Sequence, residues 1–281
     1  MSVLVLVPTP IGNLGDITLR AIETLKTVSH IVAEDTRHSR KLLSHLEIDG
    51  SRMSRLDANA TEADRQRVID WLLEGQDVAL ITDAGSPAVS DPGSALVRDA
   101  IRAGIQVIAL PGASAVTAAV AVSGLVDNAF RFVGFLPRSG PDRARAITDI
   151  STSREPVVLF ESAQRMEALL GDLGAAMAAR EIVVAREVSK LHEEIVRSTL
   201  GELAQSRREW LGEITIVLGA WEPSPQDAPT EEDIDRRIDE ELAAGVHTRT
   251  ASEKIAAWCG KGRREIYARV LERKGMNSRR D

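Results

Sequence analysis

The sequence has little cysteine and no long apolar run. Cys259 is the only cysteine among 281 residues, so no disulfide can form within the chain, which fits a reducing compartment. No stretch approaches the roughly 20 apolar residues that a membrane-spanning helix needs. The apolar start, Met1 to Pro8, lacks the basic segment and cleavage site of a secretion signal. We therefore expect a cytoplasmic protein with no membrane segment.

An excess of positive charge is also absent. The chain has 35 Lys and Arg against 42 Asp and Glu, a net charge of −7, which gives no general support to nucleic-acid binding. The charges are unevenly placed, however. Residues 227–241 hold eight acidic and two basic side chains, and residues 261–281 hold eight basic and three acidic ones. Such runs are usually solvated helix surface, which is the first interpretation here.

Aromatic side chains and metal-ligand patterns are scarce. Four Phe, four Trp and one Tyr argue against extensive stacking of bases from single-stranded RNA. The five histidines and the single cysteine form no cluster with metal-ligand spacing, so we expect no metal site.

Short apolar runs alternate with helical patterns, which predicts an α/β fold. Eight such runs are predicted strands: 3–7, 30–33, 78–81, 106–110, 130–135, 157–160, 182–185 and 214–218. The length suits about two domains. We predict an N-terminal α/β domain over 1–112, a C-terminal α/β domain over 113–222, and a linker with a helical tail over 223–281.

The predicted tail begins after a proline-rich segment. Residues 222–229 hold three prolines and are interpreted as a linker. Thr230 then caps a predicted helix that carries Ile234, Ile238 and Leu242 on one face. Two more helices are expected around 251–258 and 263–271, so the tail resembles a helix-turn-helix.

The loop after residues 78–81 is the strongest local indication of a binding site. Asp83 follows a buried run, at the position where open α/β sheets place their ligand crevices. Gly85 and Gly93 permit unusual backbone angles, while Pro87 and Pro92 stiffen the loop. The alternative is a strand followed by two tight turns, with Asp83 as a helix cap.

Several further segments carry a family resemblance. They are Pro8-Thr9-Pro10-Ile11-Gly12-Asn13-Leu14, Glu34-Asp35-Thr36-Arg37, the Asp83 loop, Pro111-Gly112-Ala113-Ser114-Ala115, Ser123-Gly124-Leu125, Gly134-Phe135-Leu136-Pro137, Phe160-Glu161-Ser162-Ala163-Gln164-Arg165 and Ala185-Arg186-Glu187-Val188-Ser189-Lys190. In this order they resemble the small-subunit ribosomal RNA (cytidine-2′-O)-methyltransferase family, which belongs to the tetrapyrrole-methylase-like class of S-adenosylmethionine enzymes. Each motif alone is weak, but their shared order is specific.

The resemblance implies a two-domain tetrapyrrole-methylase-like fold with the cofactor, S-adenosylmethionine, in the interdomain cleft, plus a small helical appendage. It implies methyl transfer to the ribose 2′-oxygen of a cytidine in 16S ribosomal RNA of the small subunit, and a homodimer. One departure stands out. Where the family commonly carries a His-Asn-Glu cluster, this chain has Ala58-Asn59-Ala60.

Candidate site residues follow from the loops and the resemblance together. For the cofactor they are Pro8, Thr9, Pro10, Asp83, Ala84, Ser86, Ser90, Ser114, Ala115, Phe160 and Thr215. For the base that removes the 2′-hydroxyl proton they are Lys190, Asp35, Glu161 and Glu193. For RNA phosphates they are Arg37, Arg40, Lys41, Arg138 and Arg143.

Purely structural roles for several of these residues stay open at this point. Phe160 and Thr215 also suit plain sheet packing. Lys190 also suits an exposed surface position, and it would act as a base only if burial lowered its pKa.

Two other functions are compatible with the sequence. One is a tetrapyrrole methyltransferase acting on an acidic macrocycle, for which a basic tail has no evident purpose. The other is a non-catalytic S-adenosylmethionine-binding module that assists ribosome assembly, which the altered Ala58-Asn59-Ala60 stretch keeps open. If the substrate is RNA, the scarcity of aromatic residues favours an assembled ribosomal particle over a short free strand.

Overall fold

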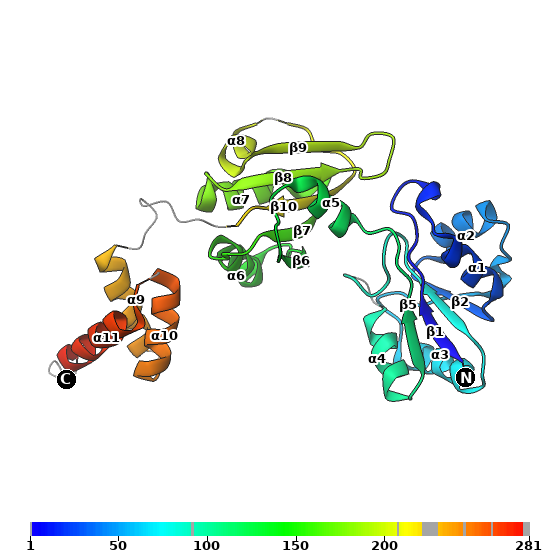
Figure 1. The fold of residues 1–281 in the computed structure, drawn as a ribbon, viewed down its shortest axis with the longest axis horizontal. Helices are drawn as coiled ribbons and strands as arrows, with labels where there is room; N and C mark the ends of the chain where they lie inside the picture. The colour runs from blue at the N-terminus through cyan, green and yellow to red at the C-terminus, as the bar shows by residue number, and fades with distance from the viewer. Residues whose placement is uncertain are drawn as a thin grey trace. The chain divides into compact units, whose positions relative to one another are not determined.

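The computed structural model describes residues 2–90, 93–206, 208–220, 230–243, 246–259 and 261–277. They belong to two compact units, Met1–Ala220 and Trp221–Asp281, each with its own buried core (Figure 1). The predicted linker over 222–229 lies outside the described residues, as do Asp91 and Pro92 of the predicted binding loop.

The first sheet of the larger unit is entirely parallel. Its strands are β1 (Val3–Leu6), β2 (His30–Ala33), β3 (Met53–Arg55), β4 (Val78–Ile81) and β5 (Gln106–Ala109), in the order β3-β2-β4-β1-β5. The four residues of β4 are all buried, which explains their unbroken apolar sequence, because a central parallel strand is covered on both faces.

Helices cover both faces of this sheet. On one face lie α1 (Leu19–Thr27) and α2 (Thr36–His45), and on the other lie α3 (Glu62–Leu73) and α4 (Ser94–Arg102) (Figure 1). The neighbouring strands β1 and β4 therefore lead into helices on opposite faces. That change of direction is the switch point at which open α/β sheets form ligand crevices, at the carboxyl ends of the strands.

The second sheet is mixed. It contains β6 (Arg131–Phe135), β7 (Val157–Ser162), β8 (Glu181–Arg186), β9 (Glu194–Thr199) and β10 (Glu213–Leu218), in the order β6-β7-β10-β8-β9. Only the β6–β7 pair of this sheet is parallel. One face is covered by α5 (Ala115–Ser123), and the other by α6 (Gly140–Ser151), α7 (Met166–Met177) and α8 (Leu200–Gln205). Short 3-10 helices span Leu14–Asp16, Gly50–Arg52 and Ala163–Arg165.

The small side chains of α5 explain its close approach to the second sheet. Val116 and Ala119 are buried against Val158, Val183 and Val217 of that sheet. The helix therefore packs on the second sheet, although its first residues follow a strand of the first. The domain boundary between residues 112 and 113 stays a prediction.

The predicted fold class is confirmed: two α/β sheets followed by C-terminal helices. All eight predicted strands are present, and β3 and β9 were missed. β3 has only three residues, Met53–Arg55, of which none is fully buried. β9 lies at a sheet edge, and its sequence EIVRST contains charged residues. Within the described residues, no helix combines the length and apolarity needed to span a bilayer.

The C-terminal unit contains three helices in its described residues: α9 (Glu231–Ala243), α10 (Thr248–Cys259) and α11 (Arg263–Asn277). Ile234, Ile238, Ile255, Ile266 and Val270 are buried in their shared core. The predicted cap at the start of α9 is present, since the Thr230 hydroxyl accepts from the Asp233 amide at 3.1 Å.

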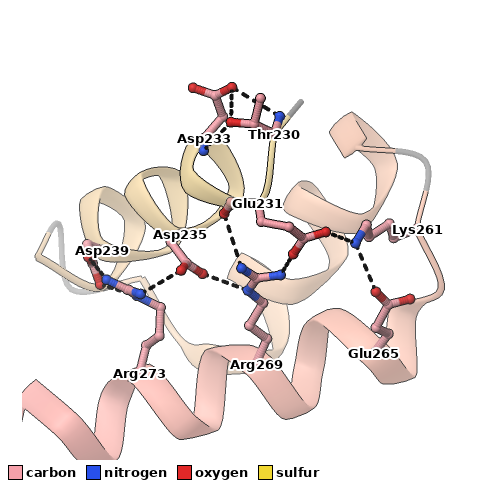
Figure 2. A network of polar contacts seen from close by, with 9 residues as sticks. All are labelled: Thr230, Glu231, Asp233, Asp235, Asp239, Lys261, Glu265, Arg269 and Arg273. Carbon is pink, nitrogen blue, oxygen red and sulfur yellow. Dashed lines mark hydrogen bonds and ion pairs between the residues drawn. The ribbon is translucent and has the colours of Figure 1, made fainter. Parts of the chain in front are cut away.

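The acidic and basic runs of the sequence pair with each other in this unit (Figure 2). On α9, acidic side chains recur every four residues, and basic side chains do the same along α11. The bonds of this network join Arg269 to Glu231 and Asp235, Arg273 to Asp235 and Asp239, and Lys261 to Glu231 and Glu265. Part of each charge run therefore forms a seam between two helices, which the sequence interpretation as solvated surface did not predict.

Candidate functional site

A cavity of about 520 Å³ lies where the two sheets of the larger unit present their loops. The first sheet contributes Ile11, Glu34, Thr82, Asp83, Ala84, Gly85, Ser86, Val89 and Ser90; the segment after β5 and the second sheet contribute Ser114, Ala115, Val116, Phe135, Phe160, Glu161, Ser162, Ala185, Val188, Gly212, Glu213, Ile214 and Thr215. The first-sheet residues all follow strands, so the cavity lies at the carboxyl ends of the strands.

Backbone bonds hold the two loops at the switch point together. Thr9 and Gly85 exchange amide-to-carbonyl hydrogen bonds of 2.9 and 3.0 Å, and the Thr9 hydroxyl donates to the Thr82 carbonyl at 3.0 Å. Gly85 has φ of 81°, a conformation that favours glycine. The loop that carries Asp83 is therefore fixed against the β1 loop before any ligand arrives.

Asp83 connects this loop to the next strand. Its Oδ1 accepts a hydrogen bond from the backbone amide of Asp35 at 3.2 Å, at the start of α2. The residue at the start of α4 is Gly93, so Asp83 is not the cap of the helix that follows it. Its carboxylate faces the cavity and still has a second oxygen available.

Close contacts join the loops of the two sheets beside the cavity. A Cβ on Gly134 would lie 2.7 Å from the Ser90 hydroxyl, and a Cβ on Gly12 would lie 2.2 Å from Cγ of Lys190. Gly134 also has φ of 65°. Glycine at both positions therefore allows the β1 and β4 loops to rest directly on the second sheet.

The cavity wall is acidic. Among the described residues that line it are the carboxylates of Glu34, Asp83, Glu161 and Glu213, and no Lys, Arg or His. The start of α5 provides the opposite polarity, because the first amides of a helix have no intrahelical acceptor. Ser114 caps that helix, with Ala115 and Val116 following it along the wall. The cavity therefore suits a ligand that carries positive charge and also a group that accepts hydrogen bonds from backbone amides.

Glu161 is the most deeply buried of these acids, with 1% of its surface exposed. Its Oε1 accepts from the Ser162 amide at 2.8 Å and pairs with Nε of Arg165 at 3.3 Å. Its Oε2 has no hydrogen-bond partner among the described residues. A buried carboxylate oxygen without a partner is costly, so this atom is a strong candidate for contact with a ligand.

Apolar side chains form the remaining wall. Phe160 and Phe135 lie with ring centroids 5.5 Å apart. Thr215 is paired with Phe160 across the β10–β7 ladder, so both project from the same face of the sheet. A planar, partly apolar ligand group would fit against this surface.

The structure brings most of the predicted cofactor residues to this cavity. Those that line it are Asp83, Ala84, Ser86, Ser90, Ser114, Ala115, Phe160 and Thr215. Pro8, Thr9 and Pro10 do not line it. Thr9 instead holds the Asp83 loop in place through its backbone hydrogen bonds to Gly85, and the nearby Ile11 lines the wall.

Among the predicted bases, only Glu161 lines the cavity. Lys190 Nζ donates to Glu187 at 2.8 Å and to Glu213 at 3.0 Å. Burial alone would lower the pKa of Lys190, but these bonds outweigh burial and raise it. The condition set for a lysine base, a lowered pKa, is therefore not met in this arrangement.

The other two acids lie outside the cavity lining. Asp35 caps α2 by accepting from the Arg37 amide at 2.7 Å, and this bond lowers the pKa of the Asp35 carboxyl. Glu193 accepts from the Ser189 amide at 2.5 Å within the turn between β8 and β9. Both have local structural partners.

The predicted RNA-binding cations differ in availability. Arg37, Arg40 and Lys41 are exposed on α2, and Arg138 is exposed after β6. Arg143 is different, because its guanidinium pairs with Asp172 at 2.7 Å and donates to the Pro137 carbonyl at 3.2 Å. The charge of Arg143 is therefore neutralised by Asp172 within the fold.

Two acids of the cavity wall, Glu34 and Glu213, were not among the candidate site residues. Glu34 directly follows β2, which lies beside β4 in the sheet, so it occupies a rim position comparable to that of Asp83. That signal was available once the strand order was known. Glu213 begins the antiparallel strand β10, whose position depends on the second sheet's topology. Among the described residues, no group of three or more His, Cys, Asp or Glu could hold a metal ion.

The fold and this cavity define a two-sheet methylase architecture, and comparison with known proteins agrees. The family model for Tetrapyrrole (Corrin/Porphyrin) Methylases matches residues 3–204. The chain belongs to this family.

Curated relatives are similar over most of the chain. The "Ribosomal RNA small subunit methyltransferase I" of Halalkalibacterium halodurans is 38% identical and covers 94% of this chain and 93% of its own. The protein of the same name from Micromonospora olivasterospora is 41% identical, covering 95% and 86%. The one from Thermotoga maritima is 42% identical, covering 79% and 100%.

Solved structures share the fold at lower identity. A diphthine synthase is 19% identical with a TM-score of 0.62, covering 78% of this chain and 90% of its own. A cobalt precorrin-4 methyltransferase is also 19% identical, with a TM-score of 0.58 and coverage of 77% and 94%. These likenesses establish the architecture alone.

Proposed function

We propose that this protein transfers the methyl group of S-adenosylmethionine to the ribose 2′-oxygen of a cytidine in small-subunit ribosomal RNA. The observation that carries the proposal is the acidic cavity at the sheet rims, in a chain 38–42% identical to three relatives named as small-subunit ribosomal RNA methyltransferases. The sequence motifs that resemble the cytidine-2′-O family supply the choice of ribose oxygen.

The residues of the cavity fit the cofactor. Its volume of about 520 Å³ lies in the range of small-molecule sites. Asp83 and Glu34 would attract the sulfonium and ammonium groups, and the start of α5 would take the carboxylate. When bound, the cofactor supplies an electrophilic methyl group. The chain's own task is to align that group with the attacking oxygen and to exclude water.

Glu161 is the base in this proposal. Its partner-free Oε2 would accept the proton of the 2′-hydroxyl, while Arg165 and the Ser162 amide hold Oε1 in place. Methyl transfer needs no further covalent chemistry from the protein. A general base of this kind contributes about 10²- to 10⁴-fold to the rate.

Glu161→Gln tests this assignment because glutamine keeps the shape and loses the basic oxygen. We expect kcat to fall by about 10²- to 10⁴-fold with cofactor affinity maintained in calorimetry. Glu193→Gln, outside the cavity, is the matched control and should keep its rate. A Glu161→Gln variant with normal kcat would remove Glu161 from the mechanism.

RNA would be held by exposed cations of the larger unit. Arg37, Arg40, Lys41 and Arg138 remain candidates for phosphate contacts, and Arg143 is the weakest of the set because Asp172 neutralises it. We also propose a homodimer in the cytoplasm. The family resemblance supports this dimer. Sedimentation velocity on the full chain tests the dimer.

The decisive experiment uses radiolabelled cofactor and small subunits from a strain without this gene. We expect label in 16S ribosomal RNA, at a cytidine whose 3′ phosphodiester bond resists alkaline cleavage because its 2′-oxygen is methylated. Label in a tetrapyrrole but not in RNA would support the macrocycle enzyme, and cofactor binding without any transfer would support the assembly module. Comparable turnover on a naked oligonucleotide would contradict the preference for an assembled particle.

A further inference from the structure

The C-terminal unit carries a cationic hollow that the proposed methyl-transfer chemistry does not use. Its volume is about 390 Å³. It is lined by Arg249, Ser252 and Glu253 of α10 and by Arg263, Arg264 and Tyr267 of α11. We call it the α10–α11 hollow. The family model ends at residue 204, before this unit begins.

Other cations of the same unit already have acidic partners. Lys261, Arg269 and Arg273 are engaged in the seam with α9 (Figure 2). Arg264 is different, since it is exposed and forms no ion pair with the residues that the structure describes. The basic tail of the sequence is therefore divided between a structural seam and an outward surface.

The arginines of the hollow are only partly neutralised. One carboxylate, Glu253, pairs with both Arg249, at 3.5 Å, and Arg263. Three guanidinium groups against one carboxylate leave an excess of two positive charges at the hollow. Like charges gathered at one surface repel each other, so an anion placed between them relieves that repulsion.

The hollow also presents an aromatic ring. Tyr267 is the only tyrosine of the chain and is 43% exposed. It lies one helical turn from Arg263 and Arg264 on α11. A cationic surface that tracks a backbone, beside a ring on which a base can stack, is the usual combination in proteins that bind single-stranded nucleic acid.

We propose that the α10–α11 hollow binds the phosphate backbone of the RNA substrate, with Tyr267 against an adjacent ribose or base. This inference rests on the proposed function, because it names how the same substrate is held. RNA is favoured because guanidinium groups match phosphate oxygens geometrically. In a chain of net charge −7, attraction for a polyanion must also come from a local surface such as this one.

The test uses the full-length protein and deproteinised small-subunit ribosomal RNA in filter binding across a series of KCl concentrations. Arg264→Ala should weaken binding at low salt and reduce the slope of log K against log[salt] by about 0.7–1, the value of one phosphate contact. Tyr267→Leu should weaken binding about 5- to 150-fold without changing the slope. Arg236→Ala on α9, an exposed arginine paired with Asp233, removes the same charge and should change neither.

Two further measurements separate docking from chemistry. Cofactor affinity and melting temperature should be the same in every variant, and KM for the assembled small subunit should rise while kcat at saturation is kept. Unaltered affinity and slope in Arg264→Ala would overturn the proposal. Binding of Arg264→Ala to phosphatidylserine vesicles is measured as well. If this variant loses vesicle binding and keeps RNA binding, the partner is a membrane and the proposal is overturned. If Arg264-dependent RNA binding is found without methyl transfer by the unaltered protein, the proposed function fails and the hollow's assignment stands.

Discussion

Replacing Asp83 by asparagine tests the electrostatic basis of the cavity. Asparagine keeps the oxygen that accepts the Asp35 amide at 3.2 Å, so the loop stays attached to the start of α2. Only the charge is lost. A unit charge about 5 Å away in an effective dielectric of about 20 interacts by about 3 kcal/mol. Asp83 is half-buried, so solvent screening reduces this to about 1–2 kcal/mol.

We therefore expect S-adenosylmethionine to bind Asp83→Asn about 5- to 30-fold more weakly in titration calorimetry. S-adenosylhomocysteine, whose sulfur is neutral, locates the effect. An equal loss of affinity for both ligands places Asp83 near the ammonium group. A smaller loss of affinity for S-adenosylhomocysteine places Asp83 near the sulfonium. Glu23→Gln, an exposed acid on α1, is the control for net charge. Undiminished affinity in Asp83→Asn and in Asp83→Ala would refute the cavity's role.

Three further predictions concern the frame around the site. Arg180→Met should lower the free energy of unfolding, measured in urea, by about 2–6 kcal/mol. The reason is that the Arg180 guanidinium donates to the buried carbonyls of Ile150 and Gly219 at 2.6 and 2.8 Å. A loss below about 1 kcal/mol would contradict this. Gly112→Ala should cost about 1–3 kcal/mol, since its Cβ would lie 2.5 Å from the rigid ring of Pro8, and an unchanged melting curve would show that the chain relaxes. Burial raises the pKa of Glu187, but its bonds to Lys190 and to the Glu213 amide outweigh burial and lower that pKa. The ionised Glu187 therefore stabilises the fold above the ordinary pKa of 4.5, and this stabilisation is lost as pH falls through the folded-state pKa. Glu187→Gln should accordingly lose less stability on acidification than the unaltered chain in pH-dependent urea unfolding, and identical profiles would exclude this contribution.

The sequence was most informative where one local pattern determines one local structure. The apolar run at residues 78–81 predicted a buried strand, and Asp83 directly after it lines the cavity. The cap at Thr230 was predictable for the same reason, since a capping box involves residues only three positions apart.

Properties that depend on distant residues were not accessible in this way. The pKa of Lys190 depends on Glu213, which is 23 positions further along the chain, and the two meet only because β10 inserts between β7 and β8. The pairing of the two charge runs likewise requires α9 and α11 to lie side by side in the same direction. Composition alone shows the runs, and it does not show that they neutralise each other.

The altered Ala58-Asn59-Ala60 stretch can now be located relative to the site. Asn59 and Ala60 border a surface hollow together with Arg55, Asp57 and other residues near the edge strand β3, and they are absent from the lining of the main cavity. The proposed base, Glu161, therefore lies in a different hollow from Asn59 and Ala60. The position of Asn59 and Ala60 outside the cavity lining is compatible with the proposed methyl transfer.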